Sequence, residues 1–387
     1  MNAPVGRTPE KGRASWLSID PNGLAMLATR FGVAPLILEP IQNSWDEQSS
    51  CVSLDLEPVP GKPLAKLVVQ DDSPDGFRDL ADAYTMFRPS YKLENPEQRG
   101  RFNIGEKLLL AVATEARITS TTGSIIFGPD GRKAGRKKTH AGSILAATIK
   151  MTRDELEQAL RLAMTLIPPQ GITTIITGVE LEPREPLATA PYTLQTEVRG
   201  EEGGFNQTRR KAEVRVHEVR DGEVPSLYEM GIPVDTIECP WHVEVMQKVP
   251  LAVDRQTVKS AYLLAVAGHV AELMADHMTE DESRAGWVGT ALEAVEDEEA
   301  IRSLVDKRFG KAVVYDPSDP EANRKAVDQG YAVVHGRSLS KKAWNKVRGA
   351  GAIAAAGQTF PSGPPPAPEQ DLREMAVHCP HCGERLQ

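Results

Sequence analysis

Hydrophobic and polar residues follow two periods along the chain, and each period predicts a type of secondary structure. Apolar residues at helical spacing predict helices over residues 36–48, 108–116, 153–166 and 255–277. Alternating or short apolar runs bounded by turn residues predict strands over residues 67–71, 144–149, 173–181, 211–219 and 236–249. Helices and strands interleaved in this way indicate an α/β protein.

The C-terminal third shows the same pattern on a smaller scale. Residues 311–316, 320–329 and 331–336 read as strand, helix and strand, which predicts one small α/β module. Asp316 and Asp319 could hold a metal, but residues of this type directly before a helix more often cap it.

Charge and composition limit the classes of partner. The chain has 387 residues, enough for two or three domains, and its net charge of -9 provides no overall field that would attract nucleic acid. Any such contact would rest on a local basic patch, formed by Arg132, Lys133, Arg136, Lys137 and Lys138. The patch follows a Gly-Pro-Asp-Gly turn signature, so we expect it to decorate a hairpin loop.

Membrane and export signals are missing from the sequence. No apolar run approaches the length of a membrane span, and residues 1–14 are polar, without the apolar core of a signal peptide. We therefore expect a cytoplasmic protein with a flexible N-terminus and reduced thiols.

Three polar side chains on the first predicted helix share one face. Glu39, Asn43 and Asp46 lie four and three residues apart, so this face would be costly to bury without partners. The face is either solvated or a binding surface. A carboxylate beside an amide suits a metal-bound triphosphate.

Three further segments follow this helix in a recognisable order. Residues 67–77 form an apolar strand that runs into an acidic turn containing Asp71 and Gly76. Residues 100–107 form a glycine loop that opens onto an apolar helix, and residues 140–149 carry a Gly-Ser step that leads into a strand. Together the four segments resemble the nucleotide-binding boxes of the GHKL ATPase superfamily, which includes gyrase, a heat-shock chaperone, sensor histidine kinases and MutL.

The resemblance covers roughly the first half of the chain and implies a fold and a set of roles. The fold would be a two-layer α/β sandwich of the GHKL (Bergerat) type, with helices on one face of a mixed sheet, followed by a transducer-like α/β domain. Glu39 would orient, or accept a proton from, the water that attacks the terminal phosphate of ATP. Asn43 would supply a neutral oxygen for Mg²⁺, and Asp46 would add a further polar wall.

An acid at the end of the second strand would select the base. It would accept a hydrogen bond from the exocyclic amine of adenine and refuse guanine. The family pattern is Asp-x-Gly-x-Gly, and this chain departs from it. If Asp71 contacts the base, the chain has one residue more than the pattern; if Asp72 contacts the base, Pro74 stands where the pattern has its first glycine. We favour Asp71 because it directly follows the alternating strand, but both assignments stay open here.

The glycine loop would cradle the phosphates. Gly100 and Gly105 let the backbone approach phosphate oxygens, and the unpaired N–H groups of the following helix favour an anion. A P-loop is excluded, because Glu106 occupies its lysine position. Lys107 either adds positive charge to the phosphates or points to solvent. The nucleotide contacts predicted from this loop and the Gly-Ser step are Gly100, Arg101, Phe102, Asn103, Ile104, Gly105, Glu106, Lys107 and Ser143.

Three more candidate phosphate contacts lie in other parts of the chain. Residues 77–99 are long enough for a lid, as the resemblance implies, and Ser90 and Lys92 are its candidates. In MutL, gyrase and the type IIB topoisomerases, a lysine of the second domain reaches the terminal phosphate. Lys248 is the candidate for that role, and the alternative is a strand-end lysine that faces water.

The C-terminal tail carries half of a zinc knuckle. Cys379 and Cys382 have the Cys-x-x-Cys spacing of a zinc ribbon, but a structural zinc needs four ligands. Cys239 and His242 could complete the set, a tail histidine or a second chain could contribute, or the tail binds no metal. The predicted organisation is a flexible N-terminus, an ATP-binding domain, a transducer-like domain, an α/β module, an Ala-, Gly- and Pro-rich linker and the tail, over residues 1–14, 15–195, 196–280, 281–348, 349–370 and 371–387.

The sequence therefore predicts Mg²⁺-dependent ATP hydrolysis coupled to lid closure and to formation of a homodimer, in a process associated with DNA or a DNA-processing partner. One alternative is a histidine kinase, which is disfavoured because no His-Glu-x-x-Pro-like phosphoacceptor helix precedes the first box. Another is a chaperone-like interaction protein that binds ATP without hydrolysing it, and Glu39 argues against this.

Overall fold

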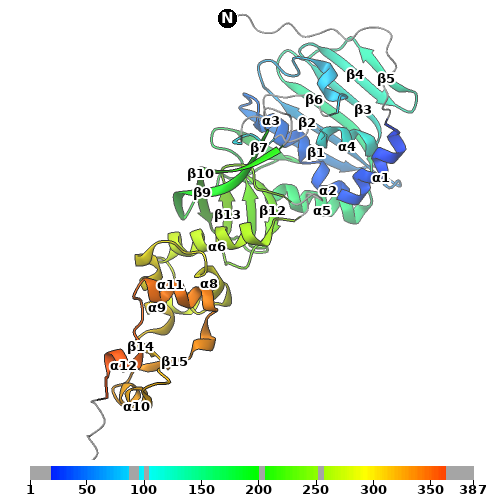
Figure 1. Ribbon diagram of the computed structural model, residues 1–387. Coiled ribbons are helices and arrows are strands. Elements are labelled where there is room, and N and C mark those ends of the chain that lie inside the picture. The colour runs from blue at the N-terminus through cyan, green and yellow to red at the C-terminus, as the bar shows by residue number, and fades with distance from the viewer. Residues whose placement is uncertain (1–18, 87–95, 100–103, 200–204, 252–256, 363–387) are drawn as a thin grey trace, which may run out of the picture. The chain divides into compact units, whose positions relative to one another are not determined.

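The computed structural model describes residues 19–86, 96–99, 104–199, 205–251 and 257–362 (Figure 1). The chain divides into two compact units, Met1–Leu263 and Leu264–Gln387. The first contains an eight-stranded and a five-stranded sheet, and the second is mainly helical, with a two-stranded sheet.

The eight-stranded sheet consists mostly of antiparallel neighbours. Its order is β5-β4-β3-β6-β2-β1-β7-β8, and β1 pairs with β7 in parallel. The strands are β1 (Cys51–Pro58), β2 (Leu64–Asp71), β3 (Ala113–Ser120), β4 (Gly123–Gly128), β5 (Gly131–Gly135), β6 (Ser143–Lys150), β7 (Thr173–Ile176) and β8 (Val179–Glu180). The predicted hairpin at the Gly-Pro-Asp-Gly signature is confirmed, because β4 and β5 pair Gly128 with Gly131.

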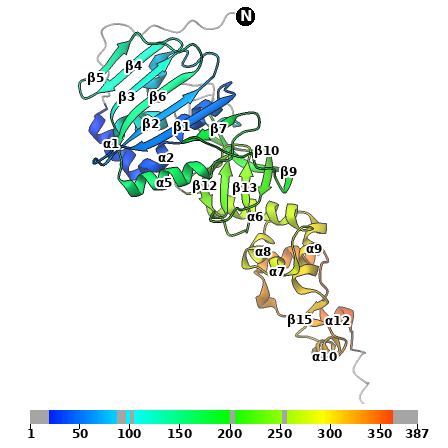
Figure 2. The ribbon, with the colours of Figure 1, turned by 180° about the vertical axis from the view of Figure 1, so that it is seen from behind.

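Helices cover one face of this sheet, whereas in the described part of the chain the opposite face carries no helix over β2, β3 and β6 (Figure 2). The helices are α1 (Pro21–Phe31), α2 (Val33–Leu36), α3 (Glu39–Trp45), α4 (Gly105–Val112) and α5 (Arg153–Met164). Alternate strand residues point toward them, as the period of a strand requires, and pack with the apolar helix faces. This core includes Ile37, Ile41, Leu54, Leu67, Val69, Leu109, Ile118, Leu145 and Ile149. The predicted two-layer α/β fold is confirmed.

Side-chain caps fix where the helices start. Asp20 accepts a hydrogen bond from the Asn22 N–H, and Pro21 takes the first position of α1, where a missing N–H costs nothing. Thr152 and Glu155 form a reciprocal capping box at the start of α5.

Several predicted boundaries are wrong, for local physical reasons. The helix predicted over 36–48 is the shorter α3, Glu39–Trp45, because Leu36 ends the preceding helix α2 and a turn separates the two. The helix predicted over 108–116 starts at Gly105 and ends at Val112, because the next residues alternate in burial and pair with β6 as β3. The strand predicted over 173–181 is the hairpin β7–β8, which turns at Thr177 and Gly178, both with positive φ.

The five-stranded sheet has the order β12-β11-β13-β10-β9. Its strands are β9 (Ala188–Arg199), β10 (Phe205–His217), β11 (Ser226–Glu229), β12 (Ile232–Thr236) and β13 (His242–Val245). The strand predicted over 236–249 is the shorter β13. Pro240 lies in the connection before this strand, where its missing N–H removes no hydrogen bond from the sheet. Ile232 belongs to the core of the eight-stranded sheet, so the two sheets share apolar contacts.

The second unit is mainly helical. Its elements are α7 (Glu280–Ser283), α8 (Gly286–Ala291), α9 (Glu298–Phe309), β14 (Ala312–Val314), α10 (Pro320–Asp328), β15 (Ala332–Val334), α11 (Lys341–Gly349) and α12 (Ala356–Thr359), while α6 (Ser260–Met274) begins before the division. The strand–helix–strand prediction is confirmed, with β14 and β15 parallel. Asp319 caps α10 through the Ala322 N–H, at 2.9 Å. Part of the predicted linker is wrong, because Ala356 of α12 packs into the core of this unit.

Among the described residues, no single helix is long and apolar enough to cross a membrane. The helical segments Pro21–Arg30 and Val33–Trp45 pass that test only as a pair, bent by 107°.

Candidate nucleotide site

Helix α3 holds the first predicted site residues against the sheet. Its apolar side is fixed by Ile41, which is fully buried, and by Trp45, whose ring nitrogen donates a hydrogen bond to Thr174 Oγ1 at 3.0 Å. Glu39 and Asn43 are half-buried. The acid and the amide therefore have defined positions beside the sheet and are not on a fully solvated helix face.

The Glu39 carboxylate lies against Gly105, the first residue of α4. A Cβ atom on Gly105 would lie 1.9 Å from Glu39 Oε2 and 2.0 Å from Cδ, far inside van der Waals contact. Any other residue at this position would displace the carboxylate. The predicted catalytic acid and the end of the predicted phosphate loop are thus brought into contact.

Asp71 and Asp72 lie in different surroundings. The Asp71 carboxylate is partly buried and accepts hydrogen bonds from the Ser73 N–H at 3.0 Å and from the Ser44 hydroxyl of α3 at 3.4 Å. Burial raises the pKa of Asp71 above its ordinary value, against hydrogen bonds from Ser73, Ser143 and Ser44 that lower it. A buried carboxylate of this kind can read a hydrogen-bond donor on a ligand.

Asp72 instead holds the start of β1. Its carboxylate accepts hydrogen bonds from the main-chain N–H groups of Ser50 and Cys51, at 2.8 and 3.0 Å, and from the Ser50 hydroxyl. Burial acts to raise the pKa of Asp72, but these hydrogen bonds lower it below its usual value. The carboxylate is exposed and already engaged by protein donors, so the geometry favours Asp71 as the base reader.

Two glycines with positive φ pack the turn beside Asp71. A Cβ on Gly76 would lie 2.4 Å from Ser120 Oγ and 3.1 Å from Ser143 Oγ, and a Cβ on Gly142 would lie 1.9 Å from the carbonyl oxygen of Asp71. The Gly142 N–H also donates to the Ser73 carbonyl at 2.7 Å. The acidic turn and the Gly-Ser step therefore form one tight backbone junction, which only glycine permits.

The start of α4 is suited to an anion. Ile104 precedes it and offers no side-chain cap, so the first N–H groups of the helix are not capped by that side chain. Glu106 and Lys107 in its first turn are both buried, with Lys107 Nζ 3.5 Å from Glu106 Oε2. The alternative that Lys107 points to solvent is therefore wrong.

Asp46 forms an ion pair that reaches the second sheet. Its side chain is 2 % exposed, and Arg99 Nη1 lies 2.9 Å from Asp46 Oδ1. The Arg99 main-chain N–H donates to the same carboxylate at 3.0 Å, and the guanidinium also donates to the carbonyl of Met230 at 2.6 and 2.8 Å. Arg99, which directly precedes the glycine loop in sequence, thus connects α3 with the turn between β11 and β12.

Lys248 lies in the loop after β13 and is fully buried, so the alternative of a strand-end lysine facing water is wrong. Its N–H donates to the carbonyl of Pro96 at 2.9 Å, and its own carbonyl accepts from the Thr196 hydroxyl at 2.8 Å. The second sheet therefore contacts the chain three residues before Arg99, on the approach to the glycine loop.

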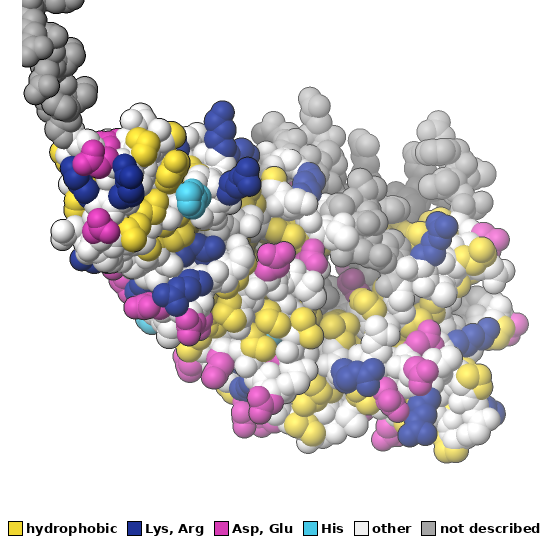
Figure 3. All heavy atoms as spheres, turned by 90° about the horizontal axis from the view of Figure 1, so that it is seen from below, with side chains coloured by type: hydrophobic (Ala, Val, Ile, Leu, Met, Phe, Trp, Pro, Cys, Tyr) yellow, Lys and Arg dark blue, Asp and Glu magenta, His cyan; other side chains and the backbone are white. Residues whose placement is uncertain are grey.

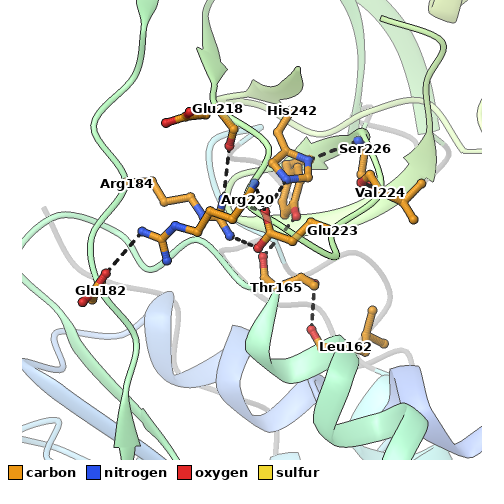
Figure 4. Close-up of polar contacts among 11 residues, drawn as sticks. Leu162, Thr165, Glu182, Arg184, Glu218, Arg220, Glu223, Val224, Ser226 and His242 are labelled. Atoms are coloured by element: carbon orange, nitrogen blue, oxygen red, sulfur yellow. Dashed lines mark hydrogen bonds and ion pairs between the residues drawn. The ribbon is translucent and has the colours of Figure 1, made fainter. Parts of the chain in front are cut away.

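A buried polar network lies at the junction of the two sheets (Figure 4). Arg184 pairs with Glu223, which also accepts from His242 Nε2 at 2.9 Å, while His242 Nδ1 accepts from the Ser226 N–H at 3.2 Å. Burial acts to raise the pKa of Glu223, but hydrogen bonds from Arg184, His242 and Arg220 bring it to about 2. Burial lowers the pKa of His242.

The same network bears on the predicted zinc ligands. Both ring nitrogens of His242 are engaged, and burial raises the pKa of the Cys239 thiol to about 11. Cys239 and His242 are therefore poorly suited to complete a zinc site. Cys379 and Cys382 lie outside the described residues.

Some predicted site residues also lie outside the described part of the chain. The structure in turn adds residues to the candidate site that were not predicted from the sequence. The site residues outside the described part are Ser90, Lys92, Gly100, Arg101, Phe102 and Asn103. The additions are Ser44, Arg99 and Ser120. Arg99 directly precedes the glycine loop in sequence, which is a usable signal, whereas Ser44 and Ser120 are visible only from tertiary contacts.

No protein-family profile and no curated protein sequence matches the chain. Among solved structures, it is similar to the ATPase region of Saccharomyces cerevisiae topoisomerase II, with 10 % identity and a TM-score of 0.36, over 57 % of this chain and 75 % of that one. The same region bound to ICRF-187 matches with 9 % identity and a TM-score of 0.34, over 57 % and 76 %. The ATPase and transducer domains of Balamuthia mandrillaris topoisomerase II match with 9 % identity and a TM-score of 0.32, over 52 % and 58 %.

Proposed function

We propose that this protein binds ATP with Mg²⁺ and hydrolyses it in the manner of a GHKL ATPase. The contact between the Glu39 carboxylate and Gly105 carries the proposal, because it puts a candidate general base beside the helix start that suits an anion. A carboxylate, an amide oxygen and the N-terminal end of a helix are the kinds of group that bind a metal-bound triphosphate.

At the base end, Asp71 accepts a hydrogen bond from the exocyclic amine of adenine. Guanine carries an oxygen there, which a buried carboxylate repels, so the site discriminates against GTP. The backbone junction of Gly76, Gly142 and Ser143 shapes this end of the pocket, and Ser44 holds the carboxylate from α3. Asp72 does not contact the base in this proposal, because its carboxylate accepts hydrogen bonds from the N–H groups at the start of β1.

At the phosphate end, Mg²⁺ would neutralise charge on the transferred phosphate, as it does in other phosphoryl transfers. Asn43 offers this hard cation a neutral oxygen. Glu39 orients the attacking water and accepts its proton. The resemblance assigns backbone N–H contacts to the loop from Gly100 through Asn103 to Ile104 and Gly105, and phosphate contacts to Ser90 and Lys92.

The second sheet senses the nucleotide. Lys248 is the candidate contact to the terminal phosphate, and its backbone bond to Pro96 supports this, because Pro96 precedes the glycine loop. Asp46 acts by holding Arg99 and not by touching nucleotide. Closure of the lid then favours a homodimer, in a process that involves DNA or a DNA-processing partner.

Two substitutions at α3 test the catalytic assignment. Glu39→Ala should retain ATP binding and lose hydrolysis, because the carboxylate acts on the attacking water, whereas Asn43→Ala should weaken binding of the Mg²⁺–ATP complex. Binding is measured by calorimetry and turnover by phosphate release. Undiminished turnover in Glu39→Ala removes the assignment, and a wild-type protein that binds ATP without any turnover supports the non-hydrolysing alternative.

A further inference from the structure

A basic groove lies on the face of the eight-stranded sheet opposite the helices. It encloses about 780 Å³ and is walled by Gln70 of β2, Arg117 and Thr119 of β3, Ile144 and Ala146 of β6 and the loop between β5 and β6, which contributes Lys137, Lys138 and His140. Alternation along the strands turns Gln70, Arg117, Thr119, Ile144 and Ala146 away from the helical layer. No described helix covers this face (Figure 2).

The cations of the groove have no partner among the residues that the structure describes. Arg117, Lys137 and Lys138 are exposed, and none of them makes an ion pair or side-chain hydrogen bond among the described residues. The two acidic residues at the groove do not balance them. The Asp71 carboxylate bonds to Ser44 of α3 in the helical layer, and Asp72 is engaged by Ser50 and Cys51. The groove thus combines three unpaired positive charges in a chain whose net charge is -9.

Elsewhere the surface charge is mixed. On the face drawn in Figure 3, Lys and Arg side chains are interspersed with Asp and Glu side chains. Some exposed cations outside the groove are paired with carboxylates, as Arg284 is with Glu280 and Lys325 with Glu321. The groove differs from such sites in that three cations without a carboxylate partner among the described residues line one concave surface.

We propose that this groove binds the phosphate backbone of double-stranded nucleic acid. The cations come from β3 and from the β5–β6 loop, so they can contact several phosphates at once, and each such contact releases counterions. Among the described residues that line the groove there is no Phe, Tyr or Trp on which unpaired bases could stack, which favours a duplex over a single strand. Contacts of this kind are independent of sequence.

The loop that carries the lysines also reaches the candidate nucleotide site. Thr139, next to Lys138, donates from its N–H to Ser120 and from its hydroxyl to the Gly142 carbonyl at 2.7 Å. Gly142 packs on the backbone of Asp71. A duplex that orders this loop would therefore change the base end of the nucleotide pocket. This coupling, unlike the groove itself, rests on the proposed function.

The test compares two triple variants, one at the groove and one away from it, each of which removes three positive charges. Arg117→Gln/Lys137→Gln/Lys138→Gln removes the groove cations, and Lys62→Gln/Lys66→Gln/Lys150→Gln removes three exposed lysines where β2 and β6 have their other ends. Binding of a fluorescent 20-base-pair duplex is followed by anisotropy without nucleotide, at several salt concentrations around ~0.1 M. Equal melting temperatures show that both variants fold.

We expect the groove variant to lose about tenfold or more in affinity and its plot of log K against log salt to flatten by about 2 to 3, at roughly 0.9 per phosphate contact. The control should keep the wild-type slope. Four outcomes would overturn the proposal. They are equal losses of affinity in both variants, no binding by the wild type, tighter binding of single-stranded than of double-stranded nucleic acid, and a preference for phosphatidylserine vesicles. If the wild-type protein binds the duplex but does not bind ATP, the proposed function is wrong and the assignment of the groove is retained.

Discussion

The contact between Glu39 and Gly105 leads to a sharp prediction for Gly105→Ala. Carbon and oxygen atoms need about 3.5 Å between them, whereas the added Cβ would lie 1.9 Å from Glu39 Oε2. The carboxylate must therefore retreat by about 1.5 Å. The obstructing atoms are the far end of a flexible side chain, so Glu39 can change rotamer and the fold should survive.

The expected effects on stability and turnover have opposite signs. Gly105 opens α4 and has no positive φ, so alanine should leave the free energy of unfolding unchanged or raise it by up to about 1 kcal/mol. Turnover should fall by on the order of a hundredfold, because a displacement of ~1 Å can cost this much in a positioned catalytic group. ATP affinity should change much less, since the carboxylate acts on water.

A double-mutant cycle separates this mechanism from general damage to the glycine loop. If Gly105→Ala acts by moving Glu39, the double variant Gly105→Ala/Glu39→Ala should turn over no more slowly than Glu39→Ala alone. Single-turnover phosphate release and calorimetric ATP binding supply the four rates and affinities. A Gly105→Ala protein with normal turnover, or losses that add in the double variant, refutes the reasoning.

Three further predictions test the base end, the junction and the tail. Asp71→Asn should weaken ATP binding by about 1–3 kcal/mol in a calorimetric titration while Asp72→Asn leaves it unchanged, and the reverse result would shift the base reader by one residue. Glu223→Gln should lower the free energy of unfolding in urea by about 1–2 kcal/mol at neutral pH. Because the folded pKa of Glu223 is depressed to about 2, this difference should shrink as the pH falls from the ordinary value of 4.5 toward 2, and a constant difference would contradict it. Elemental analysis should find about one zinc per chain, lost in Cys379→Ser or Cys382→Ser, and zinc-free wild-type protein would contradict this.

The sequence alone determined the type of several elements of the first unit, because each period is local. The strand ending at Asp71, the strand after the Gly-Ser step and the helix α5 follow from alternation or helical spacing, and the Gly-Pro-Asp-Gly signature predicts the β4–β5 turn. The alternation of Leu67, Val69 and Asp71 also carried the signal that Asp71 lies on the core side of β2.

Only the tertiary structure decided where helices end and which polar groups meet. Val112 ends α4 because the following residues pair with β6, a partner more than thirty positions away that no local period reveals. Arg99 reaches Asp46 and Met230 across 53 and 131 positions of sequence. Burial of Glu106 beside Lys107, and the space that Gly105 leaves for Glu39, depend on packing between helices. Sequence periods fix local conformation, whereas these contacts depend on how distant segments fill the same volume.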